Sequence, residues 1–399
     1  MGSLKRNITL YGFLKIFTKR VFLPLTTVYL VEVGGLSLTQ IAILAAVSAV
    51  VSICAEIPTG YFADRFTRKG ALMAVGLFCA IGTLILVVFP GFHGALVAIC
   101  FEAIGYSFLN GAGEALIYDT LEAMDESDNY PKVAGRAQSF GLIGNTVLVG
   151  LVPLTYSIDK RLPFLFGTIA YMTLFLIAHL MKEPPRPARK KLHVNPLKDL
   201  LKNLHVFVFK ASLPLFLTIG ILGALNFTSA DFTNLVFKDL GLTPSFLGFV
   251  FAASSIAGII GGYFIHLMKS LTLRNYALVD TVIFSSFFLA VGITRNLYVA
   301  IGGFVIYMGW WRLRQIMYQY HLMNMYKKTA YKATLISSLW FFVRGNEIWL
   351  PFAFVAIINA VGFYTGYIWI GALAAIILMP SFVFSTWLLS RHFQKLAKP

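Results

Sequence analysis

Charged residues are scarce in this chain. They make up 13% of its 399 residues, whereas hydrophobic residues make up 58% and aromatic residues 15%. Soluble globular domains usually carry about 25% charged residues, so this composition excludes an ordinary soluble protein. Acidic residues are the scarcer kind, with 17 Asp and Glu against 33 Lys and Arg. The composition therefore predicts an all-α integral membrane protein that crosses a lipid bilayer many times.

Cysteine is also rare, and its three copies exclude two kinds of site. Cys54, Cys79 and Cys100 all lie within apolar segments, so they supply neither a disulfide framework nor the spacing of a metal site. The sequence has no glycine-rich nucleotide loop, no metal-spaced set of His and Cys, and no polar segment that could form a soluble catalytic domain. We therefore expect no enzymatic activity, no cofactor and no metal.

Long apolar segments dominate the rest of the chain. A helix that crosses a bilayer needs about 20 apolar residues, and on this length the chain divides into twelve predicted spans, six in each half. The first six cover residues 8–33, 37–60, 70–90, 93–118, 137–157 and 162–181. The second six cover residues 211–235, 244–267, 276–294, 298–323, 333–358 and 365–389.

The cations between these spans predict the orientation. Lys and Arg are retained on the cytoplasmic side of short loops. With both termini in the cytoplasm, the cytoplasmic segments carry 23 cations and the external loops carry 4. Much of the net charge of +16 is thus a signal of topology, and it gives no reason to expect a nucleic-acid partner. The remaining six cations lie within predicted spans.

A basic linker separates the two sets of spans. Residues 182–210 contain four prolines and eight cations, so they cannot form a span. We expect an N-terminal bundle of residues 1–181, this cytoplasmic linker, and a C-terminal bundle of residues 211–399. Within the linker, residues 197–209 could form an amphipathic helix on the anionic leaflet or serve as a plain tether.

A short repeat supports the division into halves. Residues 60–62, Gly-Tyr-Phe at the end of the second span, recur as residues 262–264 near the end of the eighth. Such repeats are typical of transporters built from two halves related by an axis along the membrane normal. The repeat therefore predicts two pseudo-symmetric six-helix bundles.

The most informative segment lies between the second and third spans. Residues 60–69 read Gly-Tyr-Phe-Ala-Asp-Arg-Phe-Thr-Arg-Lys, with an Asp and three cations between two apolar segments. This pattern resembles the signature loop of the major facilitator superfamily of secondary transporters. The resemblance implies the twelve-helix fold of that family, a monomer, a substrate site between the halves, and alternating access without ATP.

The resemblance also implies a gate latch. In the family this loop locks the cytoplasmic side in the outward-facing state. We expect Arg65 and Arg68 to pair with Asp119 at the end of the fourth span, and Asp64 to accept hydrogen bonds from a helix N-terminus. The latch residues are Gly60, Asp64, Arg65, Arg68 and Asp119. Alternatively, the cations only anchor the loop on the cytoplasmic side.

A narrower resemblance concerns a prokaryotic set of the family that includes many efflux proteins. It rests on residues 56–60, 111–119 and 332–334, which read Glu-Ile-Pro-Thr-Gly, Gly-Ala-Gly-Glu-Ala-Leu-Ile-Tyr-Asp and Lys-Ala-Thr. Members of this set transport different substrates, so the resemblance does not predict a substrate for this chain. The antiporter motif expected in the fifth span is half present, because Pro153 is not preceded by Gly, which weighs against proton-driven drug export. We expect the inner membrane of a prokaryote.

Charges within the spans of the first half are candidates for the site. An ionisable residue at the centre of a span costs roughly 2.5–3.5 kcal/mol on insertion scales, so it needs a reason to be there. Arg20 lies near the middle of the first span, and Lys15 and Lys19, four residues apart, should share one helix face nearer the cytoplasm. All three could line a cavity, although Lys15 could also reach the lipid headgroups.

Glu102 is the predicted carrier of a coupling proton. It lies about nine residues, roughly 13 Å, inside the fourth span, and a carboxyl group at such a depth can hold a proton near neutral pH. Glu56 and Glu114 lie nearer the cytoplasm and could serve the latch. Each of the three acids could equally form a structural hydrogen bond between helices.

In the second half, residues 310–314 read Trp-Trp-Arg-Leu-Arg, which suits an anionic or aromatic ligand. Side chains two positions apart point to opposite sides of a helix, so at most one of the two arginines should face a cavity, and Arg312 is our candidate. Asp231 near the external end of the seventh span is another. Arg344 and Glu347, three residues apart in the eleventh span, could line the site or neutralise each other.

Together these residues predict a secondary active transporter that moves a small organic solute, anionic or amphiphilic, and is coupled to protons. Its partners would be the solute, the coupling proton and the lipid bilayer. Two alternatives stay open, a lipid or lysolipid flippase of the same fold and a non-transporting membrane sensor. A flippase would need an apolar groove open to the lipid, and a sensor would usually add a cytoplasmic domain.

Overall fold

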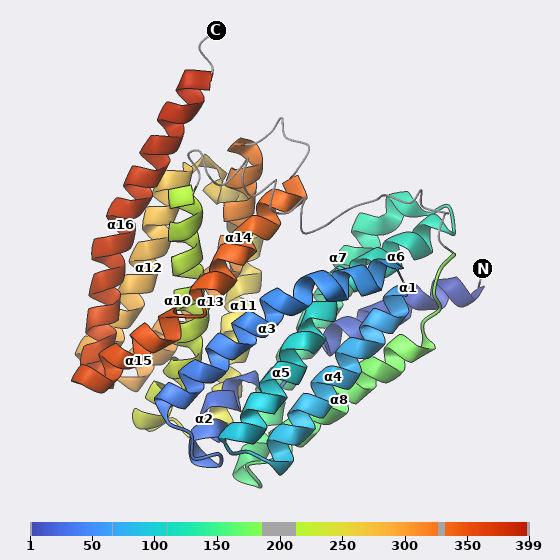
Figure 1. The fold of residues 1–399 in the computed structure, drawn as a ribbon, viewed down its shortest axis with the longest axis horizontal. Coiled ribbons are helices and arrows are strands. Elements are labelled where there is room, and N and C mark those ends of the chain that lie inside the picture. The colour runs from blue at the N-terminus through green and yellow to red at the C-terminus, as the bar shows by residue number, and fades with distance from the viewer. Residues whose placement is uncertain (1, 66, 110, 186–212, 326–331, 397–399) are drawn as a thin grey trace. The chain divides into compact units, whose positions relative to one another are not determined.

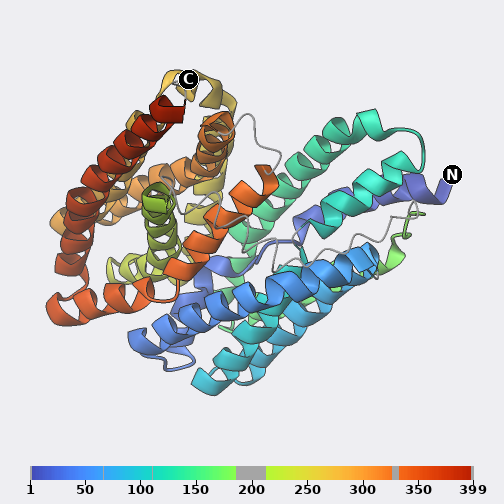
Figure 2. The ribbon, with the colours of Figure 1, turned by 45° about the horizontal axis from the view of Figure 1, so that its top comes forward.

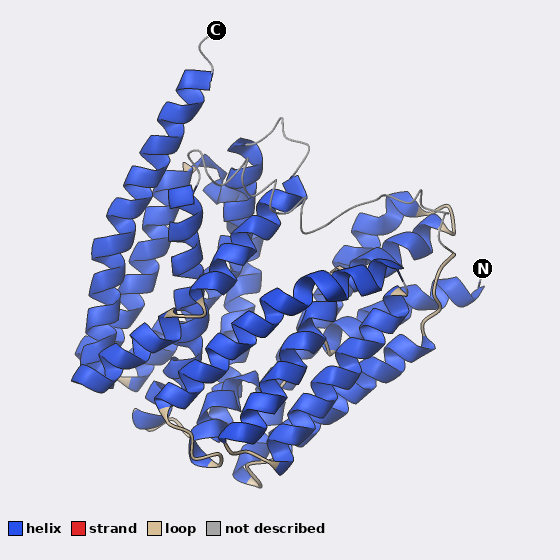
Figure 3. Cartoon of the chain, in the orientation of Figure 1, coloured by secondary structure: helices blue, strands red, loops and turns tan. Residues whose placement is uncertain are grey.

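The fold is helical throughout the part of the chain that the structure describes. This structure is a computed structural model, and it describes residues 2–65, 67–109, 111–185, 213–325 and 332–396. Every regular element in these ranges is a helix (Figure 3), which confirms the predicted all-α class. Most of the predicted linker, including the segment 197–209, lies outside the described residues.

The chain divides into two compact units, Met1–Val194 with Pro244–Phe249, and Asn195–Thr243 with Val250–Pro399. The helices up to the linker are α1 (Gly2–Ile16), η1 (Leu23–Leu25), α2 (Thr26–Glu32), α3 (Leu38–Arg65), α4 (Arg68–Val88), α5 (Phe92–Leu109), α6 (Ala112–Glu122), η2 (Ser127–Asn129), α7 (Tyr130–Leu151), η3 (Val152–Ser157) and α8 (Leu162–Leu180). Among them α4 packs between α5 and α8, and α1 packs along α7 (Figure 1).

The helices after the linker form the second set. They are α10 (Leu213–Asp239), η5 (Pro244–Phe246), α11 (Leu247–Phe264), η6 (Ile265–Ser270), α12 (Leu273–Thr294), α13 (Leu297–Met325), α14 (Lys332–Asn346), α15 (Leu350–Val361) and α16 (Phe363–Leu396). Here α12 packs along α16, and α10 packs against α14 (Figure 2).

Ten helices within the described ranges are long and apolar enough to cross a membrane. They correspond to ten of the twelve predicted spans. The tenth predicted span is α13, whose two arginines and two tryptophans near the middle lower its hydropathy. The first predicted span, residues 8–33, is broken into α1, η1 and α2. The prediction of one continuous first span was therefore wrong.

The break in the first span has a local cause. Pro24 in η1 has no amide hydrogen to donate, so an α-helix through this segment would lose the hydrogen bond to the carbonyl oxygen of Arg20. The carbonyl groups freed at the end of α1 are partly satisfied by Asn145 of α7, whose amide donates to Ile16 O at 3.2 Å and Lys19 O at 3.4 Å. Since no water is available inside a bilayer, this side chain makes the break tolerable.

Two further predicted spans are interrupted. The fourth is divided into α5 and α6 at Gly111, which has φ +74 and therefore adopts a left-handed conformation that suits glycine. The eleventh is divided into α14 and α15, where Pro351 lies in the first turn of α15. Glu347 therefore lies just after the end of α14 and not in the middle of a continuous helix, as the sequence had suggested.

The signature segment is more helical than its sequence suggests. Helix α3 continues through Gly60 to Arg65, and α4 begins at Arg68. Pro58 lies inside α3 without ending it. Thr67 caps α4, because its hydroxyl accepts a hydrogen bond from the amide of Gly70 at 2.8 Å. Most of the expected loop of residues 61–69 thus belongs to α3 and α4.

Glycine lets the helices approach closely. A Cβ atom placed at Gly76 of α4 would lie 2.6 Å from the amide nitrogen of Phe175 in α8. In the second set, a Cβ at Gly292 of α12 would lie 2.6 Å from the carbonyl oxygen of Tyr364 in α16. Small residues at such crossings drive the packing of membrane helices, where burial of apolar surface contributes little.

Candidate functional site

A buried ion pair lies at the break in the first span. Arg20 occupies the non-helical segment between α1 and η1, and Nη2 of its guanidinium lies 2.7 Å from Oε2 of Glu102 on α5. The Glu102 side chain is only 5% exposed and that of Arg20 is 23% exposed. The sequence predicted both residues as candidates but did not pair them. In a continuous helix, the helical repeat would fix the direction of the Arg20 side chain. Because the helix is broken here, the side chain can point toward Glu102.

Few other donors support this carboxylate. Among the described residues, Thr83 of α4 donates to Oε1 of Glu102 at 3.3 Å, which is a long hydrogen bond. The guanidinium of Arg20 lies over the ring of Tyr106, 5.1 Å from its centroid, and the hydroxyl of Tyr106 lies 2.7 Å from that of Tyr171. The buried Nε of Arg20 has no hydrogen-bond partner within the described part of the chain. Arg20 therefore has a buried N–H group that could donate a hydrogen bond to a ligand.

The predicted latch residues are partly brought together. Arg68 pairs with Asp119, and its guanidinium also donates to the carbonyl oxygen of Ala115. Both ionised side chains are buried. The structure does not describe the side chains of Asp64 and Arg65, so their roles stay predictions. Gly60 lies within α3, with open space where a Cβ atom would be.

A different acid caps the helix that carries Arg68. The carboxylate of Glu183 accepts hydrogen bonds from the backbone amides of Arg68 at 2.9 Å and Lys69 at 2.8 Å. The neighbouring residue, Lys182, makes two hydrogen bonds to the side chain of Asn7 on α1. Nδ2 of Asn7 donates to Lys182 O at 2.8 Å, and the Lys182 amide donates to Oδ1 of Asn7 at 2.9 Å. No sequence signal pointed to Glu183, because its partners are backbone groups more than 100 residues away.

Two of the remaining first-half candidates are brought together, since Lys15 Nζ lies 2.5 Å from Oε1 of Glu114 on α6. The expectation that Lys15 and Lys19 share a helix face was wrong, because α1 ends at Ile16. Lys19 and Glu56 are exposed.

A further buried ion pair lies among the helices after the linker. Nε of Arg314 on α13 lies 3.0 Å from Oδ2 of Asp280 on α12, and both side chains are about 95% buried, with 5% and 4% exposed. Asp280 also accepts from the indole nitrogen of Trp310 at 3.1 Å and from the Tyr318 hydroxyl at 2.9 Å. Our candidate list missed this pair, although an arginine and an acid in neighbouring spans were the available signal.

The other second-half candidates are more dispersed. Nη2 of Arg312 donates to the Ser255 hydroxyl of α11 at 2.8 Å, so the two arginines of α13 do contact different neighbours. Nη1 of Arg344 lies 2.7 Å from Oε2 of Glu347, which fits the reading of a self-neutralising pair. Asp231 is partly exposed on α10.

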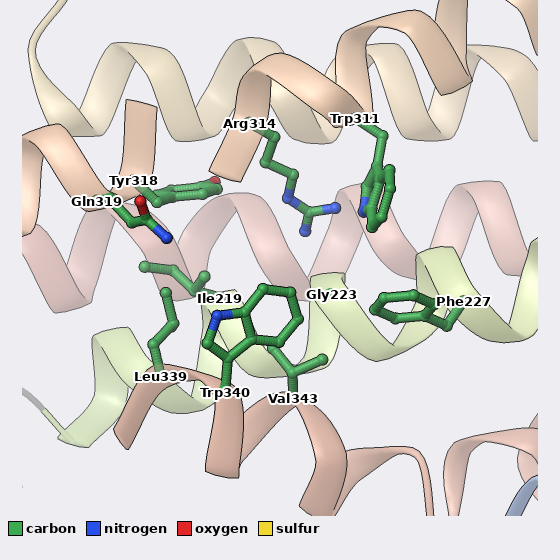
Figure 4. Close-up of a pocket in the computed structure, with 10 residues that line it drawn as sticks. All are labelled: Ile219, Gly223, Phe227, Trp311, Arg314, Tyr318, Gln319, Leu339, Trp340 and Val343. Atoms are coloured by element: carbon green, nitrogen blue, oxygen red, sulfur yellow. The ribbon is translucent and has the colours of Figure 1, made fainter. Parts of the chain in front are cut away.

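A pocket opens beside Arg314, between α10, α13 and α14 (Figure 4). Its walls are mostly aromatic and aliphatic, and among the described lining residues the arginine is the one that carries a charge. The described residues contain no group of three or more His, Cys, Asp or Glu that could hold a metal ion. Chemically, the two halves each contain a buried guanidinium paired with a carboxylate.

Comparison with known proteins gives a family from the sequence and a matching fold from solved structures. The model of the Major Facilitator Superfamily matches residues 8–346. An uncharacterized MFS-type transporter, YxaM of Bacillus subtilis (strain 168), is 23% identical over 265 residues, which cover 64% of this chain and 62% of that protein. Raffinose permease of Escherichia coli is 26% identical over 196 residues, which cover 47% and 44%. Each match spans less than two thirds of the relative's own length.

Solved structures show the same fold over nearly the whole chain. The nucleoside transporter NupG superposes with a TM-score of 0.81 at 13% identity, covering 96% of this chain and 99% of that one. A bacterial homolog of the human lysosomal transporter Spinster, in an inward-facing conformation, superposes with a TM-score of 0.70 at 14% identity, covering 98% and 97%. At such identities the likeness concerns the fold alone.

Proposed function

Because the chain belongs to the major facilitator superfamily, we propose that it is a secondary active transporter that carries a small organic anion by alternating access, coupled to protons. The observation that carries this proposal is the buried pair of Arg20 and Glu102. A carrier needs a charge within the membrane that can exchange its partner, and this pair has the chemistry to do so.

The coupling follows from charge balance. A buried carboxylate without a cationic partner is strongly unfavourable inside a membrane protein. If a substrate anion takes the place of Glu102 on the guanidinium of Arg20, Glu102 loses its main partner. Uptake of a proton then neutralises the carboxylate. Anion and proton therefore bind together, and neither is stable at the site alone.

The surroundings of Arg20 suit an incoming anion. Its Nε is free of a described partner, so an anion could bind it together with a terminal nitrogen in the bidentate manner that arginine favours. The ring of Tyr106 supports the flat face of the guanidinium. Interrupted helices are also common at the binding sites of secondary transporters.

The buried contact of Arg68 with Asp119 supports the gate latch as part of this proposal. It joins α4 to α6, while Glu183 joins α4 to the start of the linker. We infer that these contacts hold the cytoplasmic ends of the first-half helices as one body during transport. Gly60, Asp64 and Arg65 stay in the proposed latch by resemblance to the family.

Uptake into proteoliposomes tests the function. A panel of radiolabelled benzoate, lactate and succinate is offered to the reconstituted protein under an imposed pH gradient. Wild type should accumulate at least one anion, whereas Glu102→Gln should exchange that anion across the membrane but lose accumulation driven by the gradient. Glutamine mimics the protonated acid, so it leaves Arg20 open while removing the proton site.

Glu32→Gln is the matched control. Glu32 is also paired with a cation, since Nζ of Lys160 lies 2.7 Å from Oε2, but that lysine is half exposed. The control should accumulate the anion as wild type does. Gradient-driven accumulation by Glu102→Gln at the wild-type level would overturn the coupling. Transport of lysolipid with no transport of any anion would support the flippase alternative instead.

A further inference from the structure

The pocket beside Arg314 has a shape and a lining that nothing in the proposed transport cycle uses. Phe227 of α10 and Trp311 of α13 form one end, where their ring centroids lie 5.2 Å apart at 82°. Trp340 of α14 faces them across the opening (Figure 4). Gly223 of α10 lets Val343 of α14 pack closely against α10, since a Cβ atom at Gly223 would lie 2.8 Å from Cγ2 of Val343, and both residues line the pocket. These walls suit a flat aromatic group.

Arg314 supplies the charged donor among the described residues that line the pocket. Its Nε is held by Asp280, and its guanidinium lies over the Tyr318 ring, 5.8 Å from the centroid. Its Nη2 is buried and has no hydrogen-bond partner within the described residues. In Figure 4 the guanidinium extends from α13 toward α10 and α14, into the pocket. A buried donor without a partner is costly, so it points to an acceptor that the pocket receives.

The local charge decides the kind of acceptor. Asp280 already accepts three hydrogen bonds, from Arg314, Trp310 and Tyr318, so it is fixed in place and cancels the charge of the arginine. Arg344 lies over the ring of Phe227 at 5.7 Å and is itself paired with Glu347. Arg312 on the same helix as Arg314 donates to Ser255 of α11 and does not line the pocket. An added anion would find no net positive charge to offset its desolvation. A neutral acceptor avoids that cost.

We propose that this pocket binds a neutral, planar aromatic group that carries a carbonyl oxygen. The ring lies between Trp311, Trp340 and Phe227, and the carbonyl oxygen accepts a hydrogen bond from Nη2 of Arg314. Aromatic amides and the bases of nucleosides have this chemistry. The site includes neither Arg20 nor Glu102, so a test of this proposal is independent of a test of the proposed proton coupling.

Quenching of tryptophan fluorescence by brominated ligands tests the site, because bromine quenches an indole that it contacts. The probes are 4-bromobenzamide, 4-bromobenzoate and 4-bromotoluene, added to purified protein. The amide should bind at least about tenfold more tightly than the other two, since a hydrogen bond to a charged donor is worth that much. Its quenching should fall in Trp311→Phe and Trp340→Phe, and should persist in the control Trp369→Phe on α16.

Two variants of the pocket complete the test. Leu339→Phe should fill the pocket and weaken amide binding at least tenfold, whereas Ile376→Phe, on an exposed face of α16, should not. The double variant Arg314→Gln with Asp280→Asn removes the ion pair without leaving a lone charge, and it should abolish the preference for the amide over bromotoluene. Equal affinities for the three probes in wild type, or a preference that survives in the double variant, would overturn the proposal. Binding by Glu102→Gln should match wild type.

Discussion

At the scale of single residues, the carboxylates paired with Arg20 and Arg314 differ in how many hydrogen-bond donors contact them. Asp280 receives hydrogen bonds from an arginine, a tryptophan and a tyrosine. Glu102 receives one from Arg20 and a long one from Thr83. We therefore expect the first carboxylate to keep its partners, and the second to exchange its partner in the proposed transport cycle.

This difference predicts an order of stability. Asp280→Asn leaves the guanidinium of Arg314 buried without a counter-ion, so it should destabilise the protein by about 3–5 kcal/mol. Glu102→Gln should cost less, because Arg20 is 23% exposed. Thermal unfolding of the purified variants measures both effects. Adding Arg314→Gln to Asp280→Asn should restore much of the loss. A larger loss in Glu102→Gln than in Asp280→Asn would contradict this assignment.

At the scale of helices, the interruptions position the charged groups. The segment after α1 places Arg20 beside Glu102, and Glu347 follows the end of α14. Helix α4 is held at its start by Thr67 and Glu183 and is packed along its length through Gly76. The tightly packed α4 also supplies Thr83, which donates to Glu102, so it gives this carboxylate a firmly held neighbour.

The close crossing of α4 and α8 carries a prediction of its own. Gly76→Ala places a methyl group against the backbone of Phe175, so it should destabilise the protein by about 1–3 kcal/mol. Gly135→Ala on α7 is the control, because nothing lies within 4 Å of its added Cβ atom. The control should be neutral or slightly stabilising, since alanine favours a helix more than glycine does. Chemical denaturation in the same detergent compares them. Equal midpoints for the two variants would refute the close crossing.

The helices themselves could be predicted from the sequence, because a run of about 20 apolar residues is typical of a membrane-spanning helix. The interruptions could not. The sequence contains Pro24 and Pro351, but whether a proline breaks a membrane helix or only bends it depends on which side chains donate hydrogen bonds to the freed carbonyl groups. For the first span that residue is Asn145, more than 120 positions away. Pro58, by contrast, lies inside an unbroken α3.

The candidate site was predictable residue by residue but not as pairs. A charge in a long apolar run stands out, so Arg20 and Glu102 could be named from sequence alone. Their contact depends on the rotation of two helices and on the broken segment that carries Arg20. The same holds for Arg314 and Asp280, whose pairing our choice of Arg312 overlooked. Side-chain contacts across helices have no signature in a single sequence.

At the scale of the whole molecule, the distribution of cations predicts cytoplasmic termini. Labelling with a membrane-impermeant maleimide checks this in cells, with the native cysteines replaced by serine. Arg161→Cys, in the exposed segment before α8, should react from outside. Asp128→Cys, in the exposed segment between α6 and α7, should react only after the cells are opened. The reverse pattern would invert the predicted orientation.

The central claim is that an anion and a proton share the pair of Arg20 and Glu102, and proton counting tests it most directly. A transported anion from the uptake panel is added to purified protein in weakly buffered detergent solution with a pH indicator. Because the anion frees Glu102 to bind a proton, wild type should take up about one proton for each anion bound, and the solution should become more alkaline. Glu102→Gln should bind the anion with no change in pH. Equal proton uptake by both proteins, or anion binding by wild type without any uptake, would contradict the mechanism.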